Sequence, residues 1–244
     1  MNTKTTNNTA VEGKGEAVNA DLLVIPPPNT FLNIDCMALM KEMPDKYIDL
    51  AIVDPPYGIN YDLIQEQSAG TYRTQNGGTW KQYHKTNWDD SPPALEYYKE
   101  LFRVSKNQVI WGGNFFLDNL KNTKCMLIWD KVQRDNRADC EIAWTSFDKP
   151  SKIFRMSRAD AYINKCDEKI HPTQKPTELY KWVLNYLGRA GDLILDTHVG
   201  SGSSLKACKE LGYNYYGSEI DKTYYEAANK RINRAFRQFD LNLQ

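Results

Sequence analysis

The sequence has few cysteines and no long apolar run, and both absences narrow its class. Its 244 residues include five cysteines, which lie far apart and form no Cys-x-x-Cys pair. A disulfide framework and a zinc site are therefore not expected. No apolar stretch approaches the roughly 20 residues that span a bilayer, and the first 20 residues have no apolar core. The sequence predicts a soluble, reduced, cytoplasmic protein.

The chain also lacks an excess of charge of either sign. Its 31 Lys and Arg residues balance 31 Asp and Glu residues, so a nucleic-acid partner has to be argued from local basic clusters. The hydrophobic content of 41% and the charged content of 25% are ordinary for a globular protein. We expect one α/β domain over residues 29–244. Residues 1–28 are predicted to be a disordered leader that ends in the stiff connector Pro26-Pro27-Pro28.

The most informative stretch is Asp54-Pro55-Pro56-Tyr57, which follows an apolar run at 49–53. A buried strand that ends in a carboxylate, two prolines and an aromatic ring places these groups together at one edge of a sheet. Proline fixes φ and removes a backbone donor, so the turn is stiff and presents acceptors to a ligand. Seen alone, the same string is also typical of an ordinary turn between a strand and a loop.

A predicted strand, glycine turn and helix follow one another near the C-terminus. The strand at 193–196 ends in Asp196, and the helix covers 205–211. The candidate residues of the turn are His198, Gly200, Ser201, Gly202 and Ser203. Glu219 ends the next strand, 17 residues past Gly202, a spacing that suits recognition of ribose hydroxyls in a nucleotide-like cofactor. His198 fits a catalytic base or, more commonly, a packing and hydrogen-bonding group.

Two further segments offer groups to a cofactor. Residues 171–178 read His-Pro-Thr-Gln-Lys-Pro-Thr-Glu and precede a helical pattern that stops at Gly188. Lys175 beside this helix N-terminus favours a carboxylate-bearing ligand, although capping alone explains Thr177. Asp35 follows a short predicted strand at 31–34 and fits either an N-cap or a carboxylate that reaches a cofactor.

Two other stretches have features of nucleic-acid contacts. The polar loop at 58–92 interleaves aromatic and basic residues, which suits bases and phosphates; a cap packed on the sheet is the alternative. Its basic residues include Arg73, Lys81 and Lys85. Within 147–169, cations recur every three residues at Lys149, Lys152, Arg155 and Arg158. One interpretation is a stripe of cations, on a helix or a twisted sheet edge, that contacts phosphates. The other is a solvated face.

Taken together, the strings at 54–57, 171–176 and 196–202 resemble the DNA amino-methyltransferases. These enzymes transfer a methyl group from S-adenosylmethionine to adenine N6 or cytosine N4 and release S-adenosylhomocysteine. The order, with the catalytic motif first and the cofactor motif last, is similar to their β group. The resemblance covers about Phe31 to Arg231 and implies a Rossmann-like fold with helices on both faces of a mixed sheet of about seven strands. It also implies a double-stranded DNA substrate.

The resemblance assigns roles to individual residues. Asp54, Pro55, Pro56 and Tyr57 would be catalytic. Gly200, Ser201 and Gly202 would approach the cofactor, with Asp196, His198 and Ser203 beside them. Glu219 would hold the ribose, Lys175 with Thr177 would meet the methionine part, and Asp35 with Cys36 would lie near the adenine.

The chemistry of these residues supports the catalytic role. An exocyclic amine is a poor nucleophile because its lone pair is delocalised into the ring. Asp54 and the Pro55 carbonyl can each accept one N–H of the amine, and Asp54 can stabilise the developing positive charge. In-line attack then needs mainly positioning, without a metal. Because the target atom is buried in a duplex, the base is flipped out, and Tyr57 offers a face on which it can stack.

Specificity is less well defined by the sequence. Asp rather than Ser at position 54 favours adenine N6 over cytosine N4. Larger family members insert a recognition domain where this chain has only about residues 147–169, so sequence reading falls to that segment, to the loop at 58–92, or to a partner subunit or second copy. We expect a short or relaxed target sequence. The pair Thr197-His198, at the start of the glycine turn, also departs from the Pro-Phe pair that is commoner at those positions in this family. A non-catalytic nucleic-acid-binding module and methylation of RNA or a small molecule are the rival functions.

Overall fold

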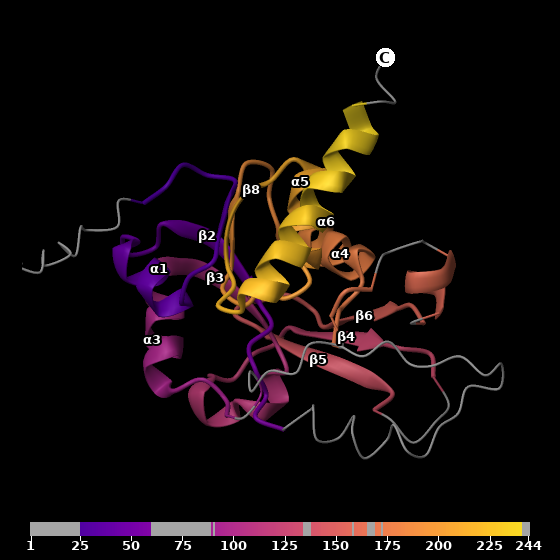
Figure 1. Cartoon of the computed structure of the whole chain (residues 1–244). Coiled ribbons are helices and arrows are strands. Elements are labelled where there is room, and N and C mark those ends of the chain that lie inside the picture. The colour runs from indigo at the N-terminus through magenta and orange to yellow at the C-terminus, as the bar shows by residue number, and fades with distance from the viewer. Residues whose placement is uncertain are drawn as a thin grey trace, which may run out of the picture.

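One mixed β-sheet with helices on both faces forms the core of the protein (Figure 1). The computed structural model describes residues 25–59, 89, 91–133, 138–157, 159–164, 169–171 and 173–240. Within these ranges the sheet has eight strands in the order β1-β8-β7-β2-β3-β5-β4-β6. The strands are β1 (Thr30–Leu32), β2 (Ile48–Val53), β3 (Ser105–Trp111), β4 (Met126–Asp130), β5 (Cys140–Thr145), β6 (Lys152–Arg155), β7 (Leu193–Asp196) and β8 (Asn214–Ser218).

The predicted fold class is confirmed, with one strand more than the seven expected. The additional strand is β6, which lies at the edge of the sheet beside β4. Its sequence is Lys-Ile-Phe-Arg, and only Phe154 is partly buried. Because β6 buries so little apolar surface, its sequence has almost no hydrophobic periodicity. The spacing of its charged residues was therefore the stronger sequence signal, and the strand was not predicted.

The helices divide into two layers (Figure 1). On one face lie α1 (Cys36–Glu42) and α3 (Leu95–Val104); on the other lie α4 (Thr177–Leu187), α5 (Ser203–Leu211) and α6 (Lys222–Asp240). The short helices η1 (Gly113–Phe115), η2 (Leu117–Asn119) and η3 (Asp160–Asn164) complete the described elements. No helix in the described ranges is both long enough and apolar enough to cross a membrane.

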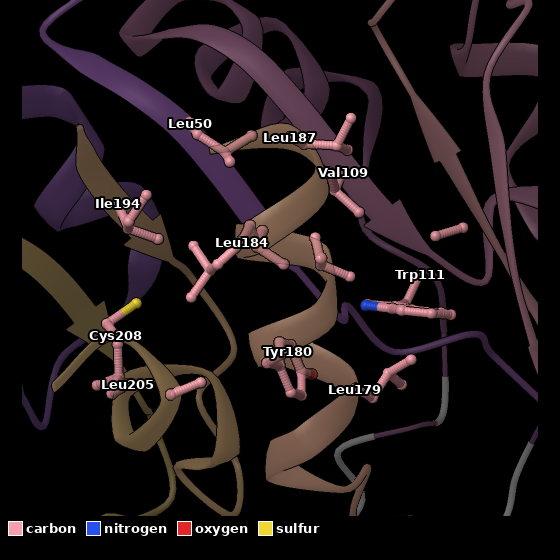
Figure 2. Packing of buried hydrophobic residues seen from close by; sticks show 14 of the residues in the cluster. Leu50, Val109, Trp111, Leu179, Tyr180, Leu184, Leu187, Ile194, Leu205 and Cys208 are labelled. Carbon is pink, nitrogen blue, oxygen red and sulfur yellow. The ribbon is translucent and has the colours of Figure 1, made fainter. Parts of the chain in front are cut away.

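The central strands supply side chains to both layers. In β2, Leu50 and Ile52 join the cluster under α4 and α5, whereas Ala51 and Val53 join the cluster under α1 and α3. Figure 2 shows the cluster under α4 and α5, in which Leu184 of α4 packs with strand residues such as Leu50 and Ile194. Successive side chains of a strand point to opposite faces, so a strand covered on both sides reads as one continuous apolar run.

The direction of β5 decides which groups meet at the edge of the sheet where most strands have their carboxyl ends. In the described part of the chain, β5 alone runs antiparallel to its neighbours, β3 and β4. The amino end of β5 therefore lies at the edge where the other strands have their carboxyl ends. Residues just after β2, β7 and β8 and the second residue of β5 consequently share one edge of the sheet.

Several local predictions can be compared with the structure. Asp35 is the N-cap of α1 and accepts the Met37 N–H at 2.6 Å, which confirms the capping interpretation. Thr177 is the first residue of α4 and not its N-cap, which is Pro176; the helix ends at the C-cap Gly188, as predicted. The helix expected at 205–211 begins earlier, at Ser203. Residues 1–24 of the predicted leader, and residues 60–88 and 90 of the predicted loop, lie outside the described residues.

Candidate active site

The Asp54 turn is fixed by hydrogen bonds at the carboxyl end of β2. The Tyr57 hydroxyl donates to Asp54 Oδ1 at 2.6 Å. The backbone N–H groups of Tyr57 and Gly58 both donate to Asp89 Oδ1, at 2.7 and 2.9 Å. Asp89 is buried, and sequence reasoning missed it although the acidic pair at 89–90 ends a long polar loop. The turn is therefore held from both sides, and its carboxylate has a defined orientation.

The Tyr57 ring lies against Gly112, at the end of β3. Gly112 has φ +69°, and a Cβ at this position would lie 2.2 Å from Tyr57 Cε1. Only glycine suits both the left-handed backbone and this close approach. The ring also stacks on Phe115 of η1 at a centroid distance of 4.9 Å. Phe115 thus covers one face of the ring that we predicted for a flipped base, while remaining 48% exposed itself.

Lys175 extends to the same carboxylate from the chain before α4. Its Nζ lies 2.5 Å from Asp54 Oδ2, 3.0 Å from Glu141 Oε2 and 3.0 Å from the Tyr57 hydroxyl. The side chain is 2% exposed. Burial opposes the charged ammonium, but Asp54 and Glu141 together raise the pKa of Lys175. We predicted that Lys175 meets the methionine part of a cofactor; its ammonium instead contacts the predicted catalytic carboxylate.

Glu141 and Lys131 extend this contact into a line of alternating charges. Glu141 Oε1 lies 3.0 Å from Lys131 Nζ, and the Lys131 side chain is 6% exposed. Burial opposes ionisation of Glu141, but Lys175 and Lys131 lower its pKa to about 2. Sequence reasoning did not select Glu141, although an acid inside the apolar strand at 140–144 was a usable signal. The order of charges is Asp54, Lys175, Glu141, Lys131.

The glycine turn after β7 forms a second set of candidate residues. Gly200 and Gly202 have φ values of +51° and +78°, which favour glycine. A Cβ on Gly200 would meet no neighbour closer than 4.0 Å, so the backbone there is open. Glu219 Oε2 accepts the Gly200 N–H at 2.8 Å, and Oε1 accepts the Asp221 N–H at 2.9 Å. The carboxylate predicted to bind ribose therefore lies directly beside the glycine turn.

The residues predicted near a cofactor adenine lie at the same edge. The Glu219 N–H donates to the Leu32 carbonyl at 3.1 Å, which joins the end of β8 to the end of β1. Asp35 and Cys36 follow β1 at the start of α1. Burial and then the Asp35 carboxylate raise the pKa of Cys36 to about 12, so this thiol is uncharged near neutral pH. The structure thus groups Asp35, Cys36 and Glu219 at one edge of the sheet.

Arg231 of α6 connects the glycine turn to the segment before α4. Its Nη1 donates to the Ser201 carbonyl at 2.8 Å and to Ser203 Oγ at 3.1 Å. Its Nη2 donates to Thr177 Oγ1 at 3.1 Å. Sequence reasoning missed this residue, yet an arginine at helical spacing from Tyr224 and Ala228 falls on the buried stripe of α6.

Asp196 ends β7 as a fully buried carboxylate. It accepts the His198 N–H at 3.0 Å and the Ser204 hydroxyl. Burial raises its pKa from 3.8 to about 7, although the hydrogen bonds from Ser204 and His198 oppose this rise. Burial also lowers the pKa of His198 to about 4, so this histidine is neutral near pH 7.

The pKa of Asp196 predicts a pH-dependent stability. The folded protein binds this proton more tightly than the unfolded chain, so ionisation of Asp196 weakens folding as pH rises from about 4 through about 7. Asp196→Asn removes that ionisation. The unfolding free energy of Asp196→Asn minus that of wild type is expected to be about 3 kcal/mol larger at pH 8 than at pH 5. Urea denaturation at both pH values measures the difference, and a difference that does not change with pH would contradict the prediction.

Two of the basic residues predicted to form a stripe, Lys152 and Arg155, do not share one face. Lys152 and Arg155 are three residues apart on β6, so their side chains point to opposite faces of the sheet. Arg155 pairs with Asp130 at 3.2 Å, and Lys149 donates to the Tyr186 carbonyl at 3.0 Å. Arg73, Lys81, Lys85 and Arg158 lie outside the described residues. Among the residues that are described, no group of three or more His, Cys, Asp or Glu side chains could hold a metal ion.

The chain is similar to known DNA-modifying proteins. A family model described as DNA methylase, of the N6/N4 type, matches residues 121–230. The type II methyltransferase M.HpaI of Haemophilus parainfluenzae is 40% identical over 91 residues, which cover 37% of this chain and 28% of that protein. The type II methyltransferase M.HinfI of Haemophilus influenzae is 27% identical over 252 aligned residues, covering 84% of this chain and 68% of that protein.

Solved structures share the fold at low sequence identity. The M1.HpyAVI–SAM complex matches with a TM-score of 0.52 and 21% identity, over 82% of this chain and 98% of that one. The PvuII DNA methyltransferase, described as cytosine-N4-specific, matches with a TM-score of 0.54 and 13% identity, over 86% and 91% of the two chains.

Proposed function

We propose that the chain, which is similar to the N6/N4 DNA methylases over residues 121–230, is an S-adenosylmethionine-dependent DNA methyltransferase that acts on adenine N6. The observation that carries this proposal is the position of the two motifs. The Asp54 turn and the Asp196–Ser203 turn follow β2 and β7, which are parallel neighbours in the sheet. Ligands of open α/β sheets bind at the carboxyl ends of such strands.

The residues around the glycine turn fit the cofactor. When bound, S-adenosylmethionine supplies an electrophilic methyl group. The open backbone at Gly200 lets a ligand approach closely, and the neighbouring Glu219 carboxylate is an acceptor for ribose hydroxyls. The residues proposed to hold the cofactor are Asp35, Cys36, Thr177, Asp196, His198, Gly200, Ser201, Gly202, Ser203 and Glu219.

Asp54 and Pro55 are proposed to prepare the amine for attack. Each carboxylate oxygen has two lone pairs, so Asp54 can accept an amine N–H while it keeps its bonds to Tyr57 and Lys175. The Pro55 carbonyl accepts the second N–H. These two acceptors localise the lone pair on nitrogen and stabilise the positive charge that develops there. The target base is flipped and stacks at Tyr57, beside Phe115.

The choice of adenine follows from Asp54, since Ser at this position is more typical of cytosine N4 enzymes. The test is to incubate the purified protein with unmethylated duplex DNA and methyl-labelled S-adenosylmethionine, and to digest the product to nucleosides. Label in N6-methyladenine is expected. Label found only in N4-methylcytosine would reassign the target base, and label found in RNA but not in DNA would reassign the substrate. The absence of any transfer would favour a non-catalytic binding module.

Contacts with DNA phosphates are proposed for the basic residues of segment 147–169. Lys152→Ala combined with Arg155→Ala is expected to weaken DNA binding. It should also reduce the slope of log affinity against log salt by roughly 0.9 for each phosphate that the protein no longer neutralises. The single variants identify which face of β6 contacts DNA. Lys99→Ala on α3, whose side chain is 64% exposed, is the control. A slope unchanged from wild type would mean that β6 presents a solvated face.

A further inference from the structure

Lys175 is shared between two carboxylates, and only one of them belongs to the motif at 54–57. The Lys175 Nζ lies 2.5 Å from Asp54 Oδ2 and 3.0 Å from Glu141 Oε2. The two carboxylates are similarly exposed, at 20% and 19%. Asp54 precedes Lys175 by 121 residues, and Glu141 reaches the same edge because β5 runs antiparallel.

A single ion pair between Asp54 and Lys175 would not suit methyl transfer. The ammonium would cancel most of the field of the carboxylate where a positive charge has to develop on the amine. It would also compete with the amine for the lone pairs of Asp54. A second carboxylate on the far side of Lys175 reduces both effects, because its charge opposes that of the ammonium and it binds the ammonium itself, while the positive Lys131 lies one contact further from Asp54.

Glu141 has the geometry for this role. One of its oxygens contacts Lys175 and the other contacts Lys131, so the carboxylate is held between two buried cations. Its low pKa, near 2, keeps it charged throughout the physiological range. The negative end of the line of charges is Asp54, next to the proposed amine, and the positive end is Lys131.

Given the proposed methyl transfer, on which this inference rests, we propose that Glu141 is a positioning residue for catalysis. It holds the Lys175 ammonium so that Lys175 orients the Asp54 carboxylate without neutralising it. Glu141 does not contact the base or the cofactor; it acts on the reaction through Lys175 and Asp54.

The test compares single-turnover methyl transfer at saturating S-adenosylmethionine and DNA. Glu141→Gln is expected to slow transfer on the order of 10- to 100-fold, while the Kd values for S-adenosylmethionine and DNA stay within about twofold of wild type. Glu141→Asp keeps the charge and is expected to remain well above Glu141→Gln in rate. The matched control is Glu210→Gln, since Glu210 is 16% exposed and also lies between two lysines, Lys181 and Lys206.

The outcomes separate this inference from the proposed function. A wild-type protein that transfers no methyl group to DNA contradicts the proposed function. An active wild type with Glu141→Gln at the wild-type rate, or with Glu141→Gln and Glu141→Asp equally slow, overturns the role of Glu141. If Glu141→Gln does not fold, combining it with Lys131→Met replaces an oppositely charged pair by two neutral side chains. That double variant is expected to show the same loss of rate, and a wild-type rate would overturn the inference.

Discussion

Replacing Asp54 by Asn is expected to slow methyl transfer by about 10³-fold, which corresponds to about 4 kcal/mol of transition-state stabilisation. The side chain keeps its shape but loses its charge and one acceptor. An amide cannot stabilise the positive charge on the amine as a carboxylate does, and its nitrogen cannot accept the amine N–H. Lys175 also loses the negative charge of its closest partner and keeps Glu141 as a counter-charge.

The measurement is the single-turnover rate with duplex DNA, together with the Kd for S-adenosylmethionine. The Kd is expected to stay within about threefold of wild type, since none of the residues proposed to hold the cofactor loses a hydrogen bond. Asp45→Asn is the control, because Asp45 is an exposed carboxylate that precedes β2, at the opposite end of this strand from Asp54, and pairs with Arg103. Transfer by Asp54→Asn at a rate close to wild type would remove Asp54 from the mechanism.

Replacing Arg231 by Met is expected to lower the unfolding free energy by about 4 kcal/mol. Arg231 is 5% exposed, and its guanidinium donates to three acceptors, the Ser201 carbonyl and the hydroxyls of Ser203 and Thr177. Met fills a similar volume but donates no hydrogen bond. Each buried acceptor that loses its donor costs about 1 to 3 kcal/mol, and the relief of burying the arginine charge offsets part of the sum.

Thermal unfolding measures this effect, and a decrease of about 10 °C is expected for a chain of this size. The affinity for S-adenosylmethionine is expected to fall by at least about tenfold, because Arg231 connects the glycine turn to the segment before α4. Arg231→Lys keeps one charged donor and should give intermediate values of both. A melting temperature within about 1 °C of wild type would show that these bonds contribute little to folding.

The sequence by itself determined the secondary structure of the interior and both motifs. The runs at 49–53, 108–111 and 193–196 lie in buried strands, and a strand that is covered on both faces is apolar over most of its length. Short strings also identified the Asp54 turn and the glycine turn, since proline and glycine fix backbone geometry locally. The capping role of Asp35 could be predicted from its position directly before a segment with the pattern of a helix.

Only the tertiary structure decided which distant charges meet. Lys175 was assigned to the cofactor from its place beside a helix, yet its ammonium contacts Asp54 and Glu141. That contact depends on strand order and on the reversed direction of β5, neither of which has a local sequence signal. Likewise, Arg231 reaches Thr177, 54 residues away, because α6 packs beside α5. Hydrophobic periodicity reports what each segment buries, whereas ion pairs between segments follow from how the sheet arranges them.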